Sequence, residues 1–290
     1  MKVAVTGASG QLGRALLAST PSGVEAVKLR HADLDITDAD AVNRRLGEVR
    51  PDCVINTAAF TDVDGAEDRP DAARQCNTEG PANLAIACAR LRARLVHLST
   101  DFVFDGGLAR PYLPQDAPAP LGVYAATKLE GEQRVLQELP TGACILRTSW
   151  LYGERGNNFV LRMLELMRTR KELKVVLDQV GAPTWTHSLA PVAWMFALRP
   201  ETGVFHWCDS GLASRYDFAM AIAEEAAELE LIEAAPAIWP ITSAEYPLRA
   251  RRPAYSVLDK RATETALGLR AEHWRVNLRR MLAAMTADWE

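Results

Sequence analysis

A glycine-rich loop directly after the first apolar run is the feature that most constrains how this chain folds. Residues 3–6 are typical of a short buried strand, and Gly7, Gly10 and Gly13 follow before a helical pattern over residues 12–19. At such a turn, one glycine allows the tight bend, one allows a pyrophosphate to approach the backbone, and one allows the helix to pack closely on the strand. The anion would lie on the unpaired N–H groups of the helix start. An ordinary tight turn is the alternative.

The pattern after the loop predicts a parallel sheet covered on both faces. Short apolar runs alternate with helical stretches of roughly 10–15 residues, which is typical of strands joined by crossover helices. We expect strands at residues 24–29, 53–56, 94–99 and 143–147, and helices at residues 38–49, 81–94 and 122–137. The expected fold class is α/β, a doubly wound parallel sheet of the Rossmann type with a smaller C-terminal substrate-binding lobe.

The second half of the chain is less regular and predicts a small lobe packed on the sheet. The expected elements are helices over residues 157–170, 187–198, 214–230 and 273–289, and a strand over residues 173–176. The pattern at 187–198 predicts an amphipathic helix, and Ser214 is the expected N-cap of the helix after it. The Glu-rich face of residues 219–231 is expected to be solvated.

Composition excludes several classes of protein. The chain carries 33 Lys and Arg against 37 Asp and Glu, which argues against binding to a nucleic-acid backbone. No window reaches the roughly 18 apolar residues of a membrane span, and glycine appears too early for a signal peptide. The five cysteines are scattered without metal-ligand spacing, as expected of free thiols in a reducing compartment. We therefore expect a cytoplasmic protein without a metal, a nucleic acid or a membrane as partner.

The end of the second strand bears on cofactor choice. An acid at this position binds the 2′-hydroxyl of NAD, whereas a basic group accepts the 2′-phosphate of NADP. Here the chain reads Lys28, Leu29, Arg30 and His31, without an acid. This favours NADPH with Arg30 as the candidate contact and leaves NADH open, and solvated surface charges are the alternative. Asp35 and Ile36, a short loop later, are candidates for contact with the adenine.

Three residues have the pattern of a proton-transfer site. Tyr124 and Lys128 lie one turn apart on a predicted helix. A phenol has a pKa near 10, and a neighbouring ammonium stabilises the phenolate and lowers that value. Thr100 ends the fourth strand, and the carboxyl ends of parallel strands face the ligand crevice. We therefore predict that Thr100, Tyr124 and Lys128 are the catalytic residues.

These segments resemble a known family. The glycine loop, residues 56–59, residues 99–101 and the Tyr124/Lys128 pair are similar to the extended short-chain dehydrogenase/reductase family that acts on nucleotide sugars. Residues 99–106, 147–153, 156–159, 178–184 and 250–259 resemble its dTDP-4-dehydrorhamnose reductase branch, so that the likeness covers nearly the whole chain. Dehydratases of this fold carry a Glu where this chain has Phe102, and its absence favours reduction.

The resemblance implies NAD(P)H-dependent reduction of dTDP-4-dehydro-L-rhamnose to dTDP-L-rhamnose, for polysaccharide synthesis. Tyr124 would donate the proton, Thr100 would orient the carbonyl, and Lys128 would also hold the nicotinamide ribose. Residues 1–150 would form the dinucleotide-binding domain, to which later segments return, and residues 151–290 mainly the nucleotide-sugar lobe. Some relatives carry a metal-binding Glu near a dimer contact where this chain has Arg14, so we expect no metal and a monomer or weak homodimer.

The resemblance also implies two sets of contacts. The cofactor would meet Gly7, Gly10, Gln11, Leu12, Gly13, Arg30, Asp35, Ile36, Ala58, Ala59, Phe60, Thr61, Tyr124 and Lys128. The sugar nucleotide would meet Thr100, Asp101, Trp150, Asn157, Asn158, Val180, Pro183, Arg251 and Arg252. Core packing of Trp150 and solvation of the two arginines are the alternatives. The alternative functions are reduction of another 4-keto nucleotide sugar, or a non-catalytic dinucleotide-binding regulatory subunit of the methionine adenosyltransferase type. The intact Thr100, Tyr124 and Lys128 set favours catalysis.

Overall fold

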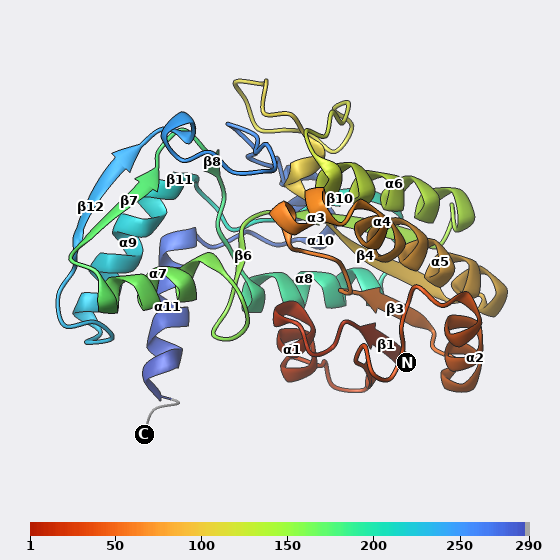
Figure 1. Cartoon of the computed structure of the whole chain (residues 1–290). Helices are drawn as coiled ribbons and strands as arrows, with labels where there is room; N and C mark the ends of the chain where they lie inside the picture. Colours follow the sequence, from red (N-terminus) through yellow and green to blue (C-terminus); the bar gives the residue numbers. More distant parts are fainter. Residues whose placement is uncertain (288–290) are drawn as a thin grey trace.

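A six-stranded, fully parallel sheet forms the centre of the molecule in a computed structural model that describes residues 1–287 (Figure 1). Its strand order is β10-β5-β4-β3-β1-β2. The strands are β1 (Lys2–Thr6), β2 (Glu25–Leu29), β3 (Cys53–Asn56), β4 (Arg94–Thr100), β5 (Ala143–Thr148) and β10 (Gly203–His206). The order reverses between β1 and β3, and ligands of such sheets bind beyond the carboxyl ends of the strands at this point. Strand β10, at one edge of the sheet, was not among the predicted elements.

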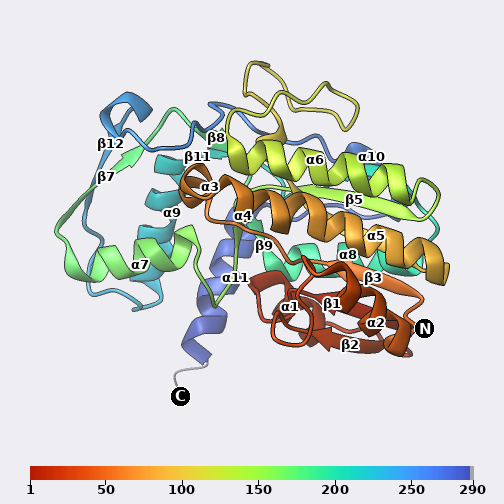
Figure 2. The same ribbon diagram turned by 45° about the vertical axis from the view of Figure 1, so that its right-hand side comes forward.

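Helices cover both faces of the sheet. Residues of β1 alternate between the faces: Val3 and Val5 pack into the core beneath α1 and α8, and Ala4 packs into the core beneath α2 and α5. Figure 2 shows α5 and α6 on one side of the strands and α1 and α8 on the other. The five helices are α1 (Gln11–Ala18), α2 (Ala39–Val49), α5 (Gly80–Leu91), α6 (Val123–Glu138) and α8 (Thr186–Leu198). The doubly wound parallel fold predicted from the sequence is confirmed.

The prediction that residues 187–198 form an amphipathic helix is wrong in its polarity. Helix α8 is buried around most of its circumference, because it packs on the sheet with one side and against the neighbouring α1 with another. Trp194 is 1% exposed, and its indole N–H donates to the carbonyl oxygen of Leu16 at 3.0 Å. A helix covered from two sides has no broad solvent-facing stripe.

The lobe has its own hydrophobic core beside the sheet (Figure 1). Phe218 lies at its centre, with ring centroids 5.5 Å from Tyr152, 5.5 Å from Phe159 and 5.7 Å from Trp274. The lobe is built from α7 (Phe159–Thr169), β7 (Glu172–Val176), α9 (Arg215–Glu228), β12 (Ala237–Ile241) and α11 (Trp274–Ala287). Strand β12 was not predicted. The end of the helix predicted over 273–289 lies outside the described residues.

The remaining elements of the described residues are short. They are α3 (Val63–Asp68), α4 (Pro70–Arg74), a π-helical turn (Gln75–Glu79), a 3-10 turn (Asp101–Val103), β6 (Leu151–Tyr152), β8 (Val180–Gly181), β9 (Thr184–Trp185), β11 (Ala213–Ser214), a 3-10 turn (Ser243–Glu245) and α10 (Arg261–Leu267). None of the helices within residues 1–287 has the length and apolar character needed to cross a membrane.

The Glu-rich face of α9 is not wholly solvated, contrary to our prediction. Glu225 is 1% exposed, because α9 packs against α11 at this point. Its carboxylate accepts hydrogen bonds from Nε of Arg275 at 3.1 Å and Nε of Arg279 at 2.6 Å. These two guanidinium groups replace the hydration that the carboxylate loses on burial.

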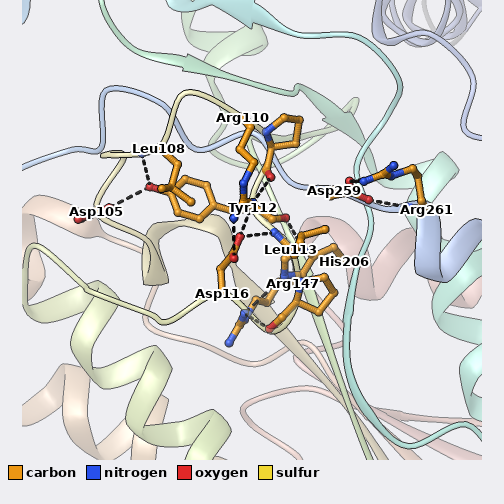
Figure 3. A network of polar contacts seen from close by, with 12 residues as sticks. Asp105, Leu108, Arg110, Tyr112, Leu113, Asp116, Arg147, His206, Asp259 and Arg261 are labelled. Atoms are coloured by element: carbon orange, nitrogen blue, oxygen red, sulfur yellow. Dashed lines mark hydrogen bonds and ion pairs between the residues drawn. The ribbon is translucent and has the colours of Figure 1, made fainter.

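A polar network holds the long connection between the Asp101–Val103 turn and α6 (Figure 3). The Tyr112 hydroxyl donates to Oδ1 of Asp105 at 2.9 Å, and the guanidinium of Arg110 donates to both carboxylate oxygens of Asp116 at 2.7 and 2.9 Å. Nδ1 of His206 lies 3.1 Å from the Tyr112 carbonyl oxygen. Burial and the nearby guanidinium of Arg147 lower the pKa of His206 to about 3, so this imidazole stays neutral at physiological pH. The network fixes the chain that enters α6, where Tyr124 lies.

Candidate active site

A cleft of about 1590 Å³ opens at the carboxyl ends of β1, β3, β4 and β5 and extends along the lobe. It is large enough for two ligands, since a typical small-molecule site measures roughly 300–1,000 Å³. The predicted site residues that line it are Gly7, Gly10, Gln11, Leu12, Asp35, Ile36, Ala58, Ala59, Thr61, Thr100, Asp101, Tyr124, Lys128, Trp150, Asn157, Asn158 and Arg252. Residues far apart in the chain thus meet around one space.

The glycine loop at the floor of the cleft fits a pyrophosphate. Helix α1 starts after Gly10, and no side chain caps its first N–H groups, so these donors are free for an anion. Gly7 has φ +63°, and a Cβ on it would lie 2.6 Å from the backbone nitrogen of Ala58. A Cβ on Gly13 would lie 2.5 Å from the carbonyl oxygen of Gly7. Gly13 therefore serves the packing of the helix on the loop and does not line the cleft.

Thr100 at the end of β4 and Tyr124 and Lys128 near the start of α6 line the same cleft. Lys128 is 2% exposed, and its Nζ donates to the Leu98 carbonyl oxygen at 2.7 Å. Burial lowers the pKa of Lys128 to about 8. Burial also raises the pKa of Tyr124 to about 12, although a hydrogen bond with the Thr100 side chain acts in the opposite direction. The phenol is thus protonated at neutral pH and able to donate its proton.

The direction of the Tyr124 shift differs from our expectation. We expected the Lys128 ammonium to lower the pKa of the phenol, but loss of hydration outweighs other influences on Tyr124 in this structure. The ammonium is engaged with the Leu98 carbonyl oxygen. Asp101 adds to the shift, because its negative charge disfavours a second anion nearby.

Asp101 is a buried carboxyl at the edge of the same site. It is 2% exposed, its Oδ2 accepts a hydrogen bond from the Ser256 hydroxyl, and its Oδ1 accepts one from Thr100 at 3.2 Å. Burial raises the pKa of Asp101 to about 6, and the Arg215 guanidinium limits that rise. The carboxyl therefore changes its protonation state in mildly acidic solution.

Arg215 is a cation in the cleft that the sequence did not indicate. Its guanidinium carbon lies 3.5 Å from the ring centroid of Trp150, within reach of a cation–π contact. The Trp150 ring also meets Gly181, where a Cβ would lie 2.5 Å from its Cε2 atom. Trp150 itself has φ +45°. Arg215 follows the helix cap Ser214, 115 positions after Thr100, and no local sequence pattern connects it with the predicted catalytic residues.

Arg252 lines the cleft with its charge already paired. Its Nη2 and Nη1 donate to the carboxylate of Asp64 in α3 at 2.6 and 3.1 Å, and the backbone nitrogen of Ala250 donates to the same carboxylate at 3.0 Å. These bonds lower the pKa of Asp64. Arg249 pairs with Asp68 one turn further along α3. The loop at 249–252 is therefore fastened to the sheet side of the cleft.

Gln11 and Asn158 join the two sides of the cleft near the glycine loop. Nε2 of Gln11 donates to the Asn157 carbonyl oxygen at 3.1 Å, and Nδ2 of Asn158 donates to Oε1 of Gln11 at 2.9 Å. Oδ1 of Asn158 accepts from the backbone nitrogen of Leu161 and caps α7. The start of α1 is thus bound to the start of α7.

Six predicted site residues lie outside the lining of the cleft: Gly13, Arg30, Phe60, Val180, Pro183 and Arg251. Arg30 is paired with Asp33, and Phe60 lies beneath the guanidinium of Arg69 at 4.8 Å from its ring centroid. Val180 pairs with Ser214 of β11. Pro183 is buried, and Arg251 is exposed.

Several lining residues were not predicted. Ser99 and Thr148, at the ends of β4 and β5, have buried hydroxyl oxygens without a protein partner. The rule that pointed to Thr100, a polar residue at the carboxyl end of a strand, could also have found Thr148. Arg14 and His31 line the end near β2, and Arg170 and Lys174 line the lobe. Within residues 1–287, no three His, Cys, Asp or Glu side chains gather as a metal site.

Known proteins resemble this chain over nearly its full length. The sequence model of the family described as RmlD substrate binding domain matches residues 1–287. Spore coat polysaccharide biosynthesis protein SpsK of Bacillus subtilis (strain 168) is 42% identical over 97% of this chain and 96% of its own length. A dTDP-4-dehydrorhamnose reductase of Aggregatibacter actinomycetemcomitans is 40% identical over 97% of this chain and 98% of its own.

A solved structure agrees in fold as well as in sequence. The dTDP-4-dehydrorhamnose reductase of Bacillus anthracis strain Ames, solved in complex with NADP, superposes with a TM-score of 0.92 at 34% identity, covering 98% of this chain and 99% of that one. The likeness includes both the sheet and the lobe, since so little of either chain lies outside it. The chain belongs to the family described as RmlD substrate binding domain.

Proposed function

We propose that this chain is an NAD(P)H-dependent reductase that converts dTDP-4-dehydro-L-rhamnose to dTDP-L-rhamnose. The observation that carries the proposal is the meeting of Thr100, Tyr124 and Lys128 in one cleft with an uncapped glycine-loop helix start. Such a start suits a dinucleotide pyrophosphate. The reductase names of the relatives described above, and NADP in one of their structures, support the same activity.

The chain's own residues account for the proton side of this reduction. Bound NADPH, or NADH in its place, would supply the hydride for sugar C4. Tyr124 donates its proton to the 4-keto oxygen, and a pKa of about 12 keeps the hydroxyl protonated until the oxygen gains negative charge. Thr100 shares a hydrogen bond with the same oxygen. Lys128 places a cation beside the ribose and the phenolate that forms.

The remaining lining residues support a nucleotide-sugar site on the lobe side. Asp101, Trp150, Asn157, Asn158 and Arg252 line the part of the cleft toward the lobe, and residues 151–290 supply three of these five. We assign the dinucleotide mainly to residues 1–150 and the sugar nucleotide mainly to the later residues. A cytoplasmic monomer or weak homodimer that makes sugar nucleotides for polysaccharide synthesis fits this assignment.

The direct test is the loss of NADPH absorbance with dTDP-4-dehydro-L-rhamnose generated in the same tube. Oxidation that depends on this sugar, with dTDP-L-rhamnose as product, is the expected result. Turnover only with a different 4-keto nucleotide sugar would change the assigned substrate and leave the assigned reaction, reduction of the 4-keto group, unchanged. Binding of NADPH without turnover of any such sugar would refute the reductase and favour a dinucleotide-binding regulatory subunit.

A further inference from the structure

The basic residue expected to recognise NADPH is already neutralised. Arg30 follows β2, and its Nε and Nη2 donate to the two carboxylate oxygens of Asp33 at 2.8 and 3.0 Å. The backbone nitrogen of Arg30 donates to the same carboxylate at 3.0 Å. These hydrogen bonds hold the pKa of Asp33 at about 2, so the pair stays ionised throughout the physiological range. Neither Arg30 nor Lys28 lines the cleft.

Arg14 is a second cation at this end of the cleft, and it comes from α1. Its Nε donates to the Ser9 carbonyl oxygen at 2.8 Å, which folds the side chain back over the glycine loop. The loop itself abuts the end of β2, because the backbone nitrogen of Ala8 lies 3.3 Å from the Leu29 carbonyl oxygen. Ser9, Arg14 and His31 all line the cleft. Among the described residues, the two terminal nitrogens of Arg14 have no hydrogen-bond or ion-pair partner.

The chemistry of this corner suits an added phosphate better than a free ribose hydroxyl. In sheets of this type, the adenosine ribose lies beside the end of the second strand. A carboxylate would be needed there to accept the 2′-hydroxyl of NAD. The acid that lines this part of the cleft is Asp35, and its Oδ1 already accepts from the backbone nitrogen and hydroxyl of Thr37 at 2.9 and 2.8 Å. The planar fork of an unpaired guanidinium matches a phosphate with two parallel hydrogen bonds.

We propose that Arg14, and not Arg30, binds the 2′-phosphate of NADPH and sets the preference of this chain for NADPH over NADH. His31 acts as a weaker second donor on the strand side. The inference rests on the proposed function, because it requires that the dinucleotide binds along the glycine loop. It does not depend on which sugar is reduced.

The test uses binding of two probes that need no reaction: adenosine 2′,5′-bisphosphate and adenosine 5′-monophosphate, which lacks the 2′-phosphate. Each is titrated calorimetrically into the full-length protein. We expect the wild type to prefer the bisphosphate and Arg14→Ala to weaken its binding by about 10-fold or more, the usual range for one charged hydrogen-bonded contact. Binding of the monophosphate should stay within about 2-fold of wild type, since only the 2′-phosphate contact is removed.

Arg30→Ala is the matched control, because it removes an arginine from the same corner of the molecule. It should leave the preference for the bisphosphate unchanged. Arg14→Lys should retain part of the preference, since it keeps the charge and loses the fork. Arg14 is exposed in this structure, so its truncation leaves the core intact, and circular dichroism of the variants checks this.

Two results would overturn the proposal in distinguishable ways. Loss of the preference in Arg30→Ala but not in Arg14→Ala would return recognition to the end of β2, with the proposed reductase unaffected. Failure of both probes to bind the wild type would remove the dinucleotide site itself, and with it the proposed function.

Discussion

Tyr124 carries the most direct prediction at the scale of single residues. Tyr124→Phe removes only the hydroxyl that we propose as the proton donor and keeps the ring in its contact with Phe102 at a centroid distance of 6.1 Å. We expect turnover to fall by on the order of 10²-fold or more, as for a lost general acid, with cofactor affinity close to wild type. Steady-state kinetics with a parallel NADPH titration measure both quantities. Turnover at the wild-type level would remove Tyr124 from the mechanism.

Asp101 predicts a pH dependence of stability. Its folded-state pKa of about 6 lies above the unfolded value of about 3.9, so the folded protein binds the extra proton between these values. The resulting stabilisation is complete below about pH 4 and is lost as the pH rises through 6. Asp101→Asn cannot titrate, and it keeps a side chain of the same shape. From pH 4.5 to 7.5, the wild type should lose on the order of 2 kcal/mol relative to this variant.

Urea unfolding at both pH values measures that difference. Asp116→Asn is a suitable reference, because Asp116 is a partly exposed carboxyl whose pKa is held at about 2 by Arg110, and it is ionised across the whole range. A constant difference between the wild type and Asp101→Asn would show that Asp101 keeps one protonation state between pH 4.5 and 7.5.

Site residues that regular helix or strand geometry brings together were predictable from the sequence. Site residues that only tertiary packing brings together were found in the structure. Tyr124 and Lys128 are one helical turn apart, and Thr100 ends a strand, so regular geometry alone makes them a candidate site. Arg215 and Asp64 reach the cleft only through the packing of the lobe and α3. Arg30 was expected to contact the cofactor, but it lies outside the cleft lining and pairs with Asp33. Sequence patterns do not show this ion pair.

At the scale of elements, the contact between α9 and α11 depends on one buried carboxylate. Glu225→Ala leaves Arg275 and Arg279 without their common acceptor and removes a buried side chain. We expect a loss of about 2 kcal/mol in the free energy of unfolding, below the roughly 3–5 kcal/mol of a fully buried pair, because both arginines are partly exposed.

Glu224 provides the comparison for this prediction. It precedes Glu225 on α9, lies about half exposed, and pairs with the same Arg275. Glu224→Ala should cost no more than about 1 kcal/mol, as usual for a surface ion pair. Equal losses in the two variants, measured by denaturant unfolding, would mean that burial of Glu225 contributes nothing.

Elements with strong periodicity were predictable, and those defined by distant partners were not. Every helix and strand expected in the first 150 residues is present, with ends shifted by up to about three residues. Strand β10 has only four residues and needs β5 beside it to be recognisable as a strand. Strand β12 likewise depends on its pairing with β7. The polarity of α8 was misjudged, because a helix with two buried sides gives no clear amphipathic signal.

At the scale of the whole molecule, Gln11 is expected to couple the two ligand sites. Gln11→Ala removes the two hydrogen bonds that join the start of α1 to residues 157 and 158. Loss of these contacts should raise KM for both the cofactor and the sugar nucleotide by about 2- to 10-fold, equivalent to one ordinary hydrogen bond, with a smaller change in kcat.

Asn43→Ala serves as the control for Gln11, since Asn43 is a surface amide on α2 that bonds Ala39 and Arg90 away from the cleft. A rise in KM for one substrate only would show that Gln11 contacts that ligand and does not couple the two sides.

The position of α8 and β10 in the chain has a consequence for how this protein is made. The first five strands of the sheet are complete by residue 148, but the helix that covers one of their faces spans residues 186–198, and the sixth strand follows at 203–206. During synthesis, one apolar face of these five strands is therefore covered only by α1, and some fifty further residues must be added before α8 covers the rest of it. At about 5–20 residues per second, the nascent chain spends several seconds in this state. Chaperone binding during synthesis should therefore concentrate on the strand residues that α8 later buries.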